Sequence, residues 1–265
     1  VVVDFIDWLT ILAEPFSVVT IPVFNTATYL TWYCTLAAVI IIWKTKIRWQ
    51  FLLIPVGVLL IAIMSQLHMV DGNNNLRVYF PYVGQGDGAV VVFPDGAVAV
   101  IDAGTSNSGI GPIEKTLHRL GIDKIDLMII SHQHPDHLGE LLSLSKDNKI
   151  IELWHNGTDS SQRLNQVSQQ IKMSGGSIKK IAKLATRQNR HGVEFAIFHP
   201  IPAIEDEPSG TYPEFSENDN SVVIRIRYGK RSLLFTGDIE KLAEEHLEGQ
   251  LPPTDILKVP HHGSN

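Results

Sequence analysis

Cysteine is almost absent from this chain, since Cys34 is the single cysteine among 265 residues. A disulfide framework and a cysteine-ligated zinc site are therefore excluded. An excess of basic residues is also lacking: 28 Asp and Glu outnumber 22 Lys and Arg, and the formal net charge is −6. This balance excludes a uniformly basic coat for nucleic acid, although it does not exclude a local basic patch.

Charged residues are missing from two long stretches near the N-terminus. Residues 17–43 and 51–69 contain no Asp, Glu, Lys or Arg. A helix needs about 20 apolar residues to cross the hydrocarbon core of a bilayer, and each stretch is long enough. Two buried core helices, or a signal peptide in the second stretch, are the alternative interpretations. Because the stretches occur in tandem, we predict two transmembrane helices within residues 1–70. Residues 1–15 are expected to form a surface helix, or else the end of an earlier span.

The loop between the two stretches is basic, with Lys44, Lys46 and Arg48 close together. Short cytoplasmic loops are enriched in Lys and Arg, so this loop is expected in the cytoplasm. One further crossing places the chain after Met69 on the opposite side of the membrane. The polar "DGNNN" segment at residues 71–75 begins the second predicted domain, residues 71–265, which we expect to be incomplete at its C-terminus.

The second domain alternates between strand-like and helix-like segments. Short apolar runs at residues 89–93 and 97–102, joined by the turn sequence "PDGA", predict a hairpin. The segment 110–121 has helical periodicity, and Gly121 is placed to end that helix. The apolar run 126–130 predicts a strand buried on both faces, and residues 135–145 are expected to form a helix. Strand-like runs follow again near the C-terminus. The order predicts an α+β fold with mixed sheets and helices outside.

The stretch "SHQHPDHLGE" at residues 131–140 concentrates potential metal ligands at the end of that buried strand. His132 and His134 are two apart, so their side chains share one side of an extended segment and can bind one ion. Asp136 and His137 follow on the turn and are directed toward a second ion. Imidazoles and carboxylates suit zinc, manganese or iron. A lone histidine is usually a structural residue, but four such groups in six positions predict a metal site.

Further ligand types follow other apolar runs. Asp102 ends "AVAVID", Asp238 follows "LLFTG", and His261 and His262 follow "DILKVP". Each alone is explained as an ordinary turn carboxylate or loop histidine. Together they predict one edge where strand ends converge, which is where open α/β sheets bind ligands.

These motifs resemble a known family. "SHQHPDHLG" matches the H-x-H-x-D-H signature of the metallo-β-lactamase superfamily. More narrowly, "VGQGDGAVVVFPDGAVAVIDAG", "NDNSVVIRIRYGKRSLLFTGDIE" and "DILKVPHHGS" resemble the C-terminal domain of ComEC-type competence proteins, which are bacterial membrane channels for DNA uptake. The resemblance implies a metallo-β-lactamase-like αββα sandwich preceded by two transmembrane helices, with a hydrolase domain at residues 71–265.

The resemblance also implies roles for individual residues and two divalent ions, zinc or manganese, as cofactors. The metal ligands would be His132, His134, Asp136, His137, Asp238 and His262, and the catalytic groups would be Asp136, Asp238 and His261. Asp238 would bridge the two ions. Asp102 would orient a ligand histidine, and Asp87 would lie near the same edge. The superfamily's middle histidine has no clear counterpart, so His155, His199 and Asn218 are further candidates.

The function implied is hydrolysis of DNA phosphodiesters at a multi-pass bacterial cell membrane, in a periplasmic or extracellular domain that degrades the strand not imported. Expected partners are DNA, membrane lipid, the rest of the channel and other competence proteins. One basic cluster would contact phosphates, or else is an ordinary solvated face; it comprises Lys172, Lys179, Lys180, Lys183, Arg187 and Arg190. The alternatives are a non-catalytic domain that guides DNA and a metallohydrolase of small esters or phosphodiesters.

Overall fold

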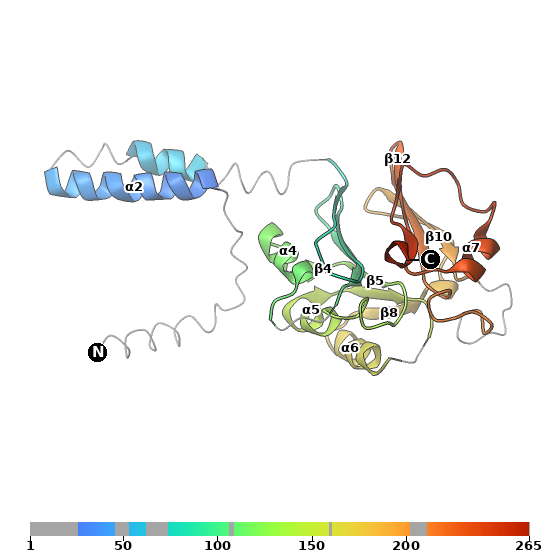
Figure 1. The fold of residues 1–265 in the computed structure, drawn as a ribbon. Coiled ribbons are helices and arrows are strands. Elements are labelled where there is room, and N and C mark those ends of the chain that lie inside the picture. Colours follow the sequence, from blue (N-terminus) through green and yellow to red (C-terminus); the bar gives the residue numbers. More distant parts are fainter. Residues whose placement is uncertain are drawn as a thin grey trace.

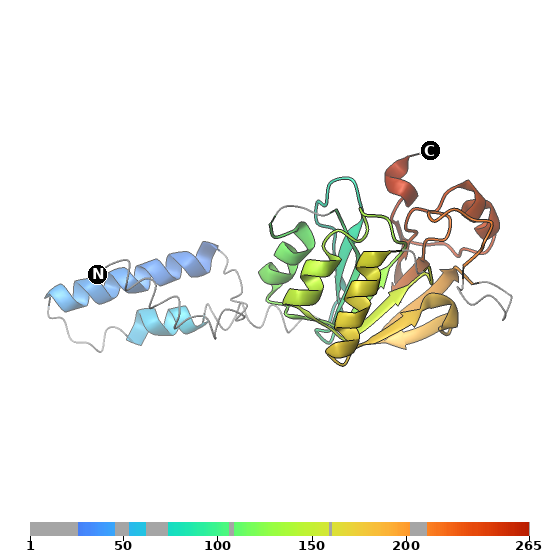
Figure 2. The ribbon, with the colours of Figure 1, turned by 90° about the horizontal axis from the view of Figure 1, so that it is seen from below.

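The computed structural model describes residues 26–45, 53–61, 74–105, 109–158, 161–201 and 211–264. Near the N-terminus, helix α2 (Thr26–Thr45) lies beside a second helical segment, residues 53–61 (Figures 1 and 2). The Thr35 hydroxyl donates to the carbonyl of Thr31 at 2.8 Å and lies 3.2 Å from that of Pro55, which joins the two segments.

Within the described residues, no helix has both the length and the hydropathy that a membrane span requires. The predicted surface helix at residues 1–15 and parts of both uncharged stretches, residues 17–25, 51–52 and 62–69, lie outside the described residues. So do Lys46, Arg48 and the start of the predicted domain at residue 71.

The rest of the chain builds two main sheets. The first has the order β1-β2-β3-β5-β7-β8 and the second the order β13-β12-β11-β10-β9, while β4 and β6 form a short separate pair. The strands are β1 (Arg77–Tyr79), β2 (Gly88–Val92), β3 (Val98–Ala103), β4 (Lys124–Ile125), β5 (Leu127–Ile130), β6 (Lys149–Ile150), β7 (Glu152–His155), β8 (Ser177–Lys180), β9 (Arg187–Arg190), β10 (Val193–His199), β11 (Val223–Tyr228), β12 (Arg231–Phe235) and β13 (Ile256–Leu257).

Helices cover the outer faces of both sheets. Three helices, α4 (Pro112–Leu120), α5 (Leu141–Asp147) and α6 (Gln162–Met173), lie side by side against the first sheet (Figure 2). Helix α7 (Lys241–Leu247) packs against the second sheet. Two short 3₁₀ turns, η3 (Ile181–Lys183) and η4 (Pro260–Gly263), complete the elements. The four layers match the expected αββα sandwich.

The layers form because successive side chains of each central strand face opposite sides of the sheet. On β2 and β3, Val90 and Val100 face the helices, whereas Val91 and Ile101 face the second sheet. Successive side chains of a strand point to opposite faces, so a strand with both faces covered reads as a continuous apolar run. Burying each of these side chains contributes about 1.5–3 kcal/mol. The hairpin predicted from residues 89–93 and 97–102 is therefore confirmed, since β2 and β3 pair in an antiparallel arrangement.

Two expectations about local structure were wrong. Residues 135–140 were expected to be helical, but α5 begins only at Leu141. The preceding turn instead bonds to the end of β3: Ala103 N donates to the carbonyl of His137 at 2.8 Å, and Glu140 N donates to that of Ala103 at 2.8 Å. Strands β8 and β9 were not expected, because "SIKK" and "RQNR" carry few apolar residues. Both lie at sheet edges, where charged strands are common.

Candidate metal centre

Four side chains converge at one edge of the sandwich. Asp136, His137, Asp238 and His262 each offer a ligand atom, and these atoms lie within 4.8 Å of one another. Asp238 Oδ2 is 3.2 Å from His137 Nε2 and 3.3 Å from His262 Nε2. His262 Nε2 is also 3.4 Å from Asp136 Oδ2. The sequence predicted these four residues as ligands, and the fold brings them together from three separate segments.

The chain reaches this edge through tight turns. Asp238 follows β12 through Gly237, whose φ is +55°. A Cβ on Gly237 would lie 2.7 Å from the Cβ of Ser221 and 2.9 Å from that of Ser131. Glycine is therefore required there both by its left-handed backbone and by the close approach of two neighbouring segments. The same close packing buries Asp238, whose backbone N–H donates to Ser221 Oγ at 3.1 Å.

Asp102 orients His137, the role that the resemblance implied. Asp102 Oδ2 accepts a hydrogen bond from His137 Nδ1 at 3.0 Å, and Asp102 Oδ1 accepts one from Ser131 N at 2.7 Å. Asp102 itself has a φ of +56°, which is uncommon for a residue other than glycine. A carboxylate on Nδ1 fixes the tautomer of an imidazole and leaves Nε2 to face a metal.

Charges at the centre shift the pKa values of its side chains. Burial alone would lower the pKa of His137, but the carboxylates of Asp102 and Asp238 raise it to about 10. Burial would raise the pKa of Asp238, but the hydrogen bond and the positive charge of His137 hold it well below its usual range. Burial, together with the charge on His137, lowers the pKa of His132 to about 2.

His132 and His134 lie beside the four-residue cluster. The ring of His132 is fully buried, with its centroid 4.2 Å from that of His137 and 4.6 Å from that of His134. Its Nδ1 lies 3.1 Å from Ser131 Oγ and 3.2 Å from Ser221 Oγ. His134 is more exposed, and its Nε2 is 3.9 Å from a carboxylate oxygen of Glu217.

The residues present fit a metal centre. Two buried atoms, His132 Nε2 and Asp238 Oδ1, make no hydrogen bond, and His137 Nε2 faces the carboxylate of Asp238 at 3.2 Å. Buried polar atoms are normally paired, so such atoms pointing into one cluster indicate that a ligand completes it. Imidazole nitrogens and carboxylate oxygens are a donor set for zinc or manganese. The six predicted ligands would hold the ions here.

The other predicted residues lie around or away from the cluster. His261 lies outside the four-residue cluster, with its Nδ1 3.3 Å from Glu240 Oε1. Asn218 Nδ2 also bonds Glu240 at 2.9 Å, and Asn218 Oδ1 is buried without a hydrogen bond. His199 donates to the carbonyl of Asp219 at 2.7 Å and stacks on Tyr212, so it packs inside the second-sheet layer.

His155 faces a different part of the fold. It lines a cavity of about 240 Å³ together with α6 residues, and Lys172 and Lys180 also border that cavity. Three residues were candidates for the missing middle histidine. Asn218 lies beside Glu240. His155 and His199 are not among the residues of the four-residue cluster.

Sequence reasoning missed several residues at the centre. Ser131 and Ser221 contact His132, and Lys258 lies 3.6 Å from Asp238 Oδ1 and forms an ion pair with Asp87. Single serines and a single lysine carry no distinctive pattern. Lys258 does lie four residues before His262 in "KVPHH", and that proximity was the available signal.

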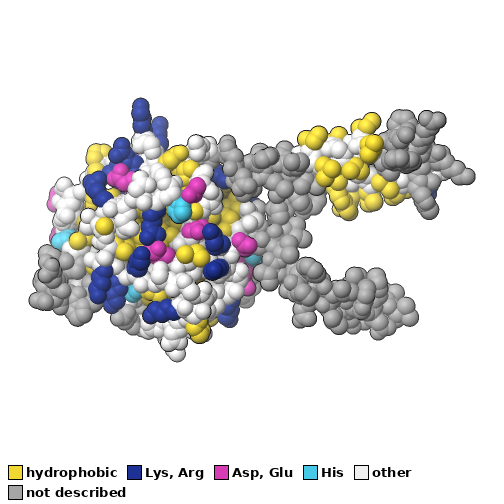
Figure 3. All heavy atoms as spheres, turned by 180° about the vertical axis from the view of Figure 1, so that it is seen from behind, with side chains coloured by type: hydrophobic (Ala, Val, Ile, Leu, Met, Phe, Trp, Pro, Cys, Tyr) yellow, Lys and Arg dark blue, Asp and Glu magenta, His cyan; other side chains and the backbone are white. Residues whose placement is uncertain are grey.

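The predicted basic cluster is divided among several environments. Lys179 and Arg190 both pair with Glu152, at 2.8 Å and 3.0 Å, and Arg187 pairs with Glu194 at 3.2 Å. Lys172 and Lys183 are exposed. On the face shown in Figure 3, Lys and Arg side chains are scattered among Asp and Glu and do not form one continuous stripe.

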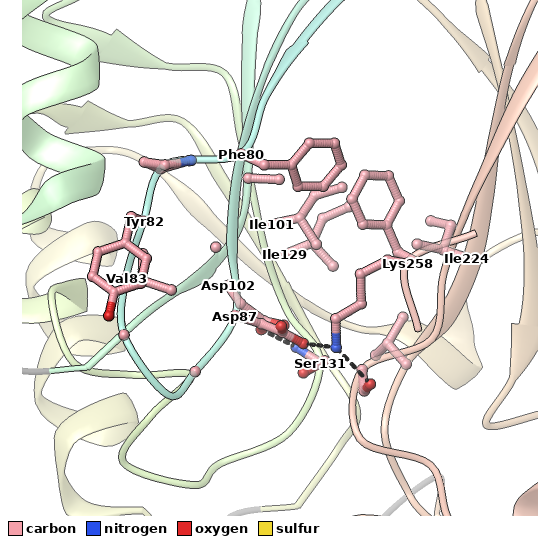
Figure 4. A pocket seen from close by; sticks show the side chains of 18 residues that line it. Phe80, Tyr82, Val83, Asp87, Ile101, Asp102, Ile129, Ser131, Ile224 and Lys258 are labelled. Atoms are coloured by element: carbon pink, nitrogen blue, oxygen red, sulfur yellow. Dashed lines mark hydrogen bonds and ion pairs between the residues drawn. The ribbon is translucent and has the colours of Figure 1, made fainter. Parts of the chain in front are cut away.

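An apolar cavity of about 210 Å³ opens beside the centre (Figure 4). Phe80, Ile101, Ile129 and Ile224 contribute to its apolar wall, and Asp87, Asp102, Ser131 and Lys258 line its polar part. The space between the two sheets is therefore open at the metal-centre end.

The fold, together with the cluster of His and Asp side chains, is of the type found in metal-dependent hydrolases. The chain belongs to the metallo-β-lactamase superfamily, whose family model matches residues 82–265. It is 28% identical over 201 residues to ComE operon protein 3 of Bacillus subtilis, an alignment that covers 69% of this chain and 25% of that protein. It is 27% identical over 186 residues to Recombination protein 2 of Haemophilus influenzae, covering 69% of this chain and 21% of that protein.

The chain thus spans about a quarter of the length of these curated relatives. Among solved structures, the metallo-β-lactamase fold protein YhfI of Bacillus subtilis matches with 12% identity and a TM-score of 0.43, covering 68% of this chain and 70% of that one.

Proposed function

We propose that residues 71–265 form a metal-dependent nuclease that hydrolyses DNA phosphodiesters, in a bacterial membrane channel for DNA uptake. The cluster of Asp136, His137, Asp238 and His262, with atoms within 4.8 Å of one another, is the observation that carries the hydrolase proposal. The DNA substrate is supported by the two relatives whose names refer to the ComE operon and to recombination. In this role the domain degrades the strand that is not imported.

The predicted residues have separate roles in the proposed hydrolysis: some bind metal, one orients a ligand and one contacts the substrate. When bound, divalent ions polarise a phosphoryl oxygen and supply a nucleophile from water at neutral pH. His132, His134, Asp136, His137, Asp238 and His262 hold these ions. Asp102 keeps Nε2 of His137 directed at the cluster. His261 lies at the edge of the site, where its ring can contact a substrate phosphate, and Glu240 holds its Nδ1 at 3.3 Å.

The proposed location is a multi-pass bacterial cell membrane, with the hydrolase domain in the periplasm or outside the cell. It rests on the two uncharged stretches and on the basic residues Lys44, Lys46 and Arg48 between them. The proposed partners are DNA, membrane lipid, the rest of the channel and other competence proteins.

A nuclease assay with varied metals tests the proposal. The full chain, freed of metal, is incubated with single- and double-stranded DNA and with zinc, manganese or magnesium. Cleavage that requires added metal, and that is lost on chelation, is the expected result. DNA that binds but stays intact under every metal condition would instead support the non-catalytic guide.

The cavity beside the centre favours a second candidate, hydrolysis of small esters or phosphodiesters. A volume of about 210 Å³ with an apolar wall accommodates a small organic group. A small chromogenic phosphodiester and DNA are therefore compared at the same enzyme concentration. Faster turnover of the small substrate, with DNA untouched, would favour this candidate over the nuclease.

A further inference from the structure

Asp87 contacts the last histidine of the cluster. Its Oδ1 lies 3.4 Å from His262 Nδ1, while His262 Nε2 lies 3.3 Å from Asp238 Oδ2. The same arrangement occurs at His137, whose Nδ1 bonds Asp102 and whose Nε2 lies 3.2 Å from the same oxygen of Asp238. Two carboxylate–imidazole pairs therefore converge on Asp238 Oδ2.

The backbone of Asp87 is fixed on both sides. Asp87 N donates to the carbonyl of Asp136 at 3.3 Å, and the Asp87 carbonyl accepts from Gly104 N at 2.7 Å. The preceding Gly86 has a φ of +151°, and a Cβ there would lie 2.5 Å from the Asp136 carbonyl oxygen. Only glycine permits this close approach, so the loop before β2 is held directly against the turn that carries the predicted ligands.

Lys258 binds the other oxygen of Asp87. Its ammonium forms an ion pair with Asp87 Oδ2, as Figure 4 shows, and donates to the Gly237 carbonyl at 3.0 Å. Both side chains are largely buried, with 14% of Asp87 and 16% of Lys258 exposed.

We propose that Asp87 is a positioning residue for the metal-binding His262, and that Lys258 fixes Asp87 in this role. A carboxylate that accepts the Nδ1 proton sets the ring orientation and leaves Nε2 free for metal. Lys258, Asp87 and His262 thus form a three-residue chain that ends at the metal centre. The inference concerns metal binding and holds whether or not DNA is the substrate.

A double-mutant cycle in metal affinity tests the proposal. The full chain is stripped of metal and titrated with Zn²⁺ against a chelator of known affinity, as wild type, Asp87→Ala, His262→Ala and the double variant. Loss of a carboxylate behind a ligand histidine costs on the order of 10–100-fold in metal affinity. Asp87→Ala should show that loss, and should add little when His262 is already Ala, because coupled residues are not additive.

Two results would overturn the role of Asp87. One is an unchanged affinity in Asp87→Ala. The other is the same fold-loss in the wild-type and His262→Ala backgrounds, because Asp87 would then act independently of His262. Thermal unfolding checks that each variant is folded, and Asp87→Asn replaces Asp87→Ala if the latter fails to fold. The amide keeps the shape of the side chain but cannot balance the charge of Lys258, so the same loss is expected.

Asp126→Ala is the matched control. Asp126 pairs with Lys124 at 2.8 Å, accepts a hydrogen bond from Val98 N at 2.9 Å, and is 16% exposed, which resembles the setting of Asp87. It lies at the opposite end of β3 from Asp102, so this change should lower stability and leave zinc affinity unchanged.

Lys258→Met tests the last member of the chain. Zinc affinity should fall, by less than in Asp87→Ala, and the change should add little in the Asp87→Ala background. A rise in zinc affinity would overturn the role of Lys258, because the ammonium would then act only as a positive charge that competes with the metal.

Discussion

Glu152 and Arg190 form an ion pair with two hydrogen bonds that joins the two sheets, at 3.0 Å from Nη1 to Oε2 and 3.1 Å from Nη2 to Oε1. Glu152 is on β7 of the first sheet and Arg190 on β9 of the second. The indole of Trp154 donates to the same carboxylate at 2.6 Å, and the guanidinium lies 4.8 Å above that indole ring. This contact closes the edge of the sandwich at β8 and β9.

The Glu152 contact gives the first prediction, a pH dependence of stability. Burial would raise the pKa of Glu152, but Arg190, Lys179 and Trp154 lower it from 4.5 to about 2. A carboxylate with a lowered folded-state pKa stabilises the fold above its unfolded value. That contribution, on the order of 3 kcal/mol, should therefore be lost between about pH 4.5 and pH 2. Glu152→Gln should lower the free energy of unfolding at pH 7 and flatten its dependence in that window.

Urea unfolding of the metal-free protein measures this effect. Glu194→Gln is the control, because Glu194 pairs with Arg187 at 3.2 Å while 72% of the Arg187 side chain is exposed. Exposed pairs contribute about 0–1 kcal/mol, so the control should change little. Equal effects of the two substitutions would show that the contact between Glu152 and Arg190 does not stabilise the sandwich.

The second prediction concerns the predicted DNA contacts. Lys179 is engaged with Glu152, whereas Lys172 and Lys183 are exposed. Each phosphate contact adds about 0.7–0.9 to the slope of log affinity against log salt. Lys172→Ala combined with Lys183→Ala should therefore weaken DNA binding and flatten that slope by about 1–2, while Lys179→Ala should keep the slope and lower stability. Fluorescence anisotropy across a salt series measures this, and identical slopes for wild type and the double variant would exclude these two contacts.

The fold was predictable where the apolar pattern was strong. Residues 126–130 predicted β5. On β11, Ile224 and Ile226 alternate with Arg225 and Arg227, and both isoleucines lie in the core between the sheets. Strands β8 and β9 were not predictable from apolar alternation, because their side chains form ion pairs at an edge. The start of α5 was misplaced, because the turn before it bonds to β3, a contact that local propensity does not encode.

The candidate site was predictable only in part, for a similar reason. The ligands in "HQHPDH" are close in sequence, so their spacing indicates metal binding directly. The contact between Asp87 and Lys258 joins residues from opposite ends of the domain. Each residue stands in a motif that resembles the family, but neither motif indicates that the two side chains meet. Such a contact depends on how the first and second sheets pack, so it is found only in the folded structure.

The third prediction is that the full chain binds two divalent ions. The six candidate ligands are divided between one set with Asp136, His137, Asp238 and His262, and the neighbouring pair His132 and His134. Elemental analysis after gentle purification should give about two ions per chain, consistent with a two-ion site. A metal-free sample that takes up neither zinc nor manganese would contradict this prediction.

The fourth prediction concerns topology. Lys44, Lys46 and Arg48 predict a cytoplasmic loop, so the chain that follows should be exported. A reporter that is active only outside the cytoplasm, fused after Asp71 in the intact protein, should be active. A second fusion within the 44–48 loop is the control and should be inactive. Reversal of the two signals would place the hydrolase domain in the cytoplasm and contradict an encounter with incoming DNA.

The last prediction concerns catalysis by Asp238. Its Oδ2 faces both His137 and His262, and its Oδ1 is buried without a hydrogen bond, so both oxygens are placed for metal. Loss of a residue that only supports a metal ligand costs about 10–100-fold. Asp238 is itself placed for metal, so Asp238→Ala should reduce cleavage of DNA by at least about 100-fold. His134→Ala should approach the same loss, since its ring lies beside His132 at a centroid distance of 4.6 Å.

Asp255→Ala is the control for Asp238→Ala, because Asp255 pairs with Arg231 at 2.8 Å on the far end of β12. It should leave cleavage intact. DNA binding is measured in parallel, because loss of a carboxylate that is placed for metal should remove turnover more strongly than affinity. If folded Asp238→Ala and the wild type process DNA identically, the nuclease proposal is wrong, and the domain guides DNA without cutting it.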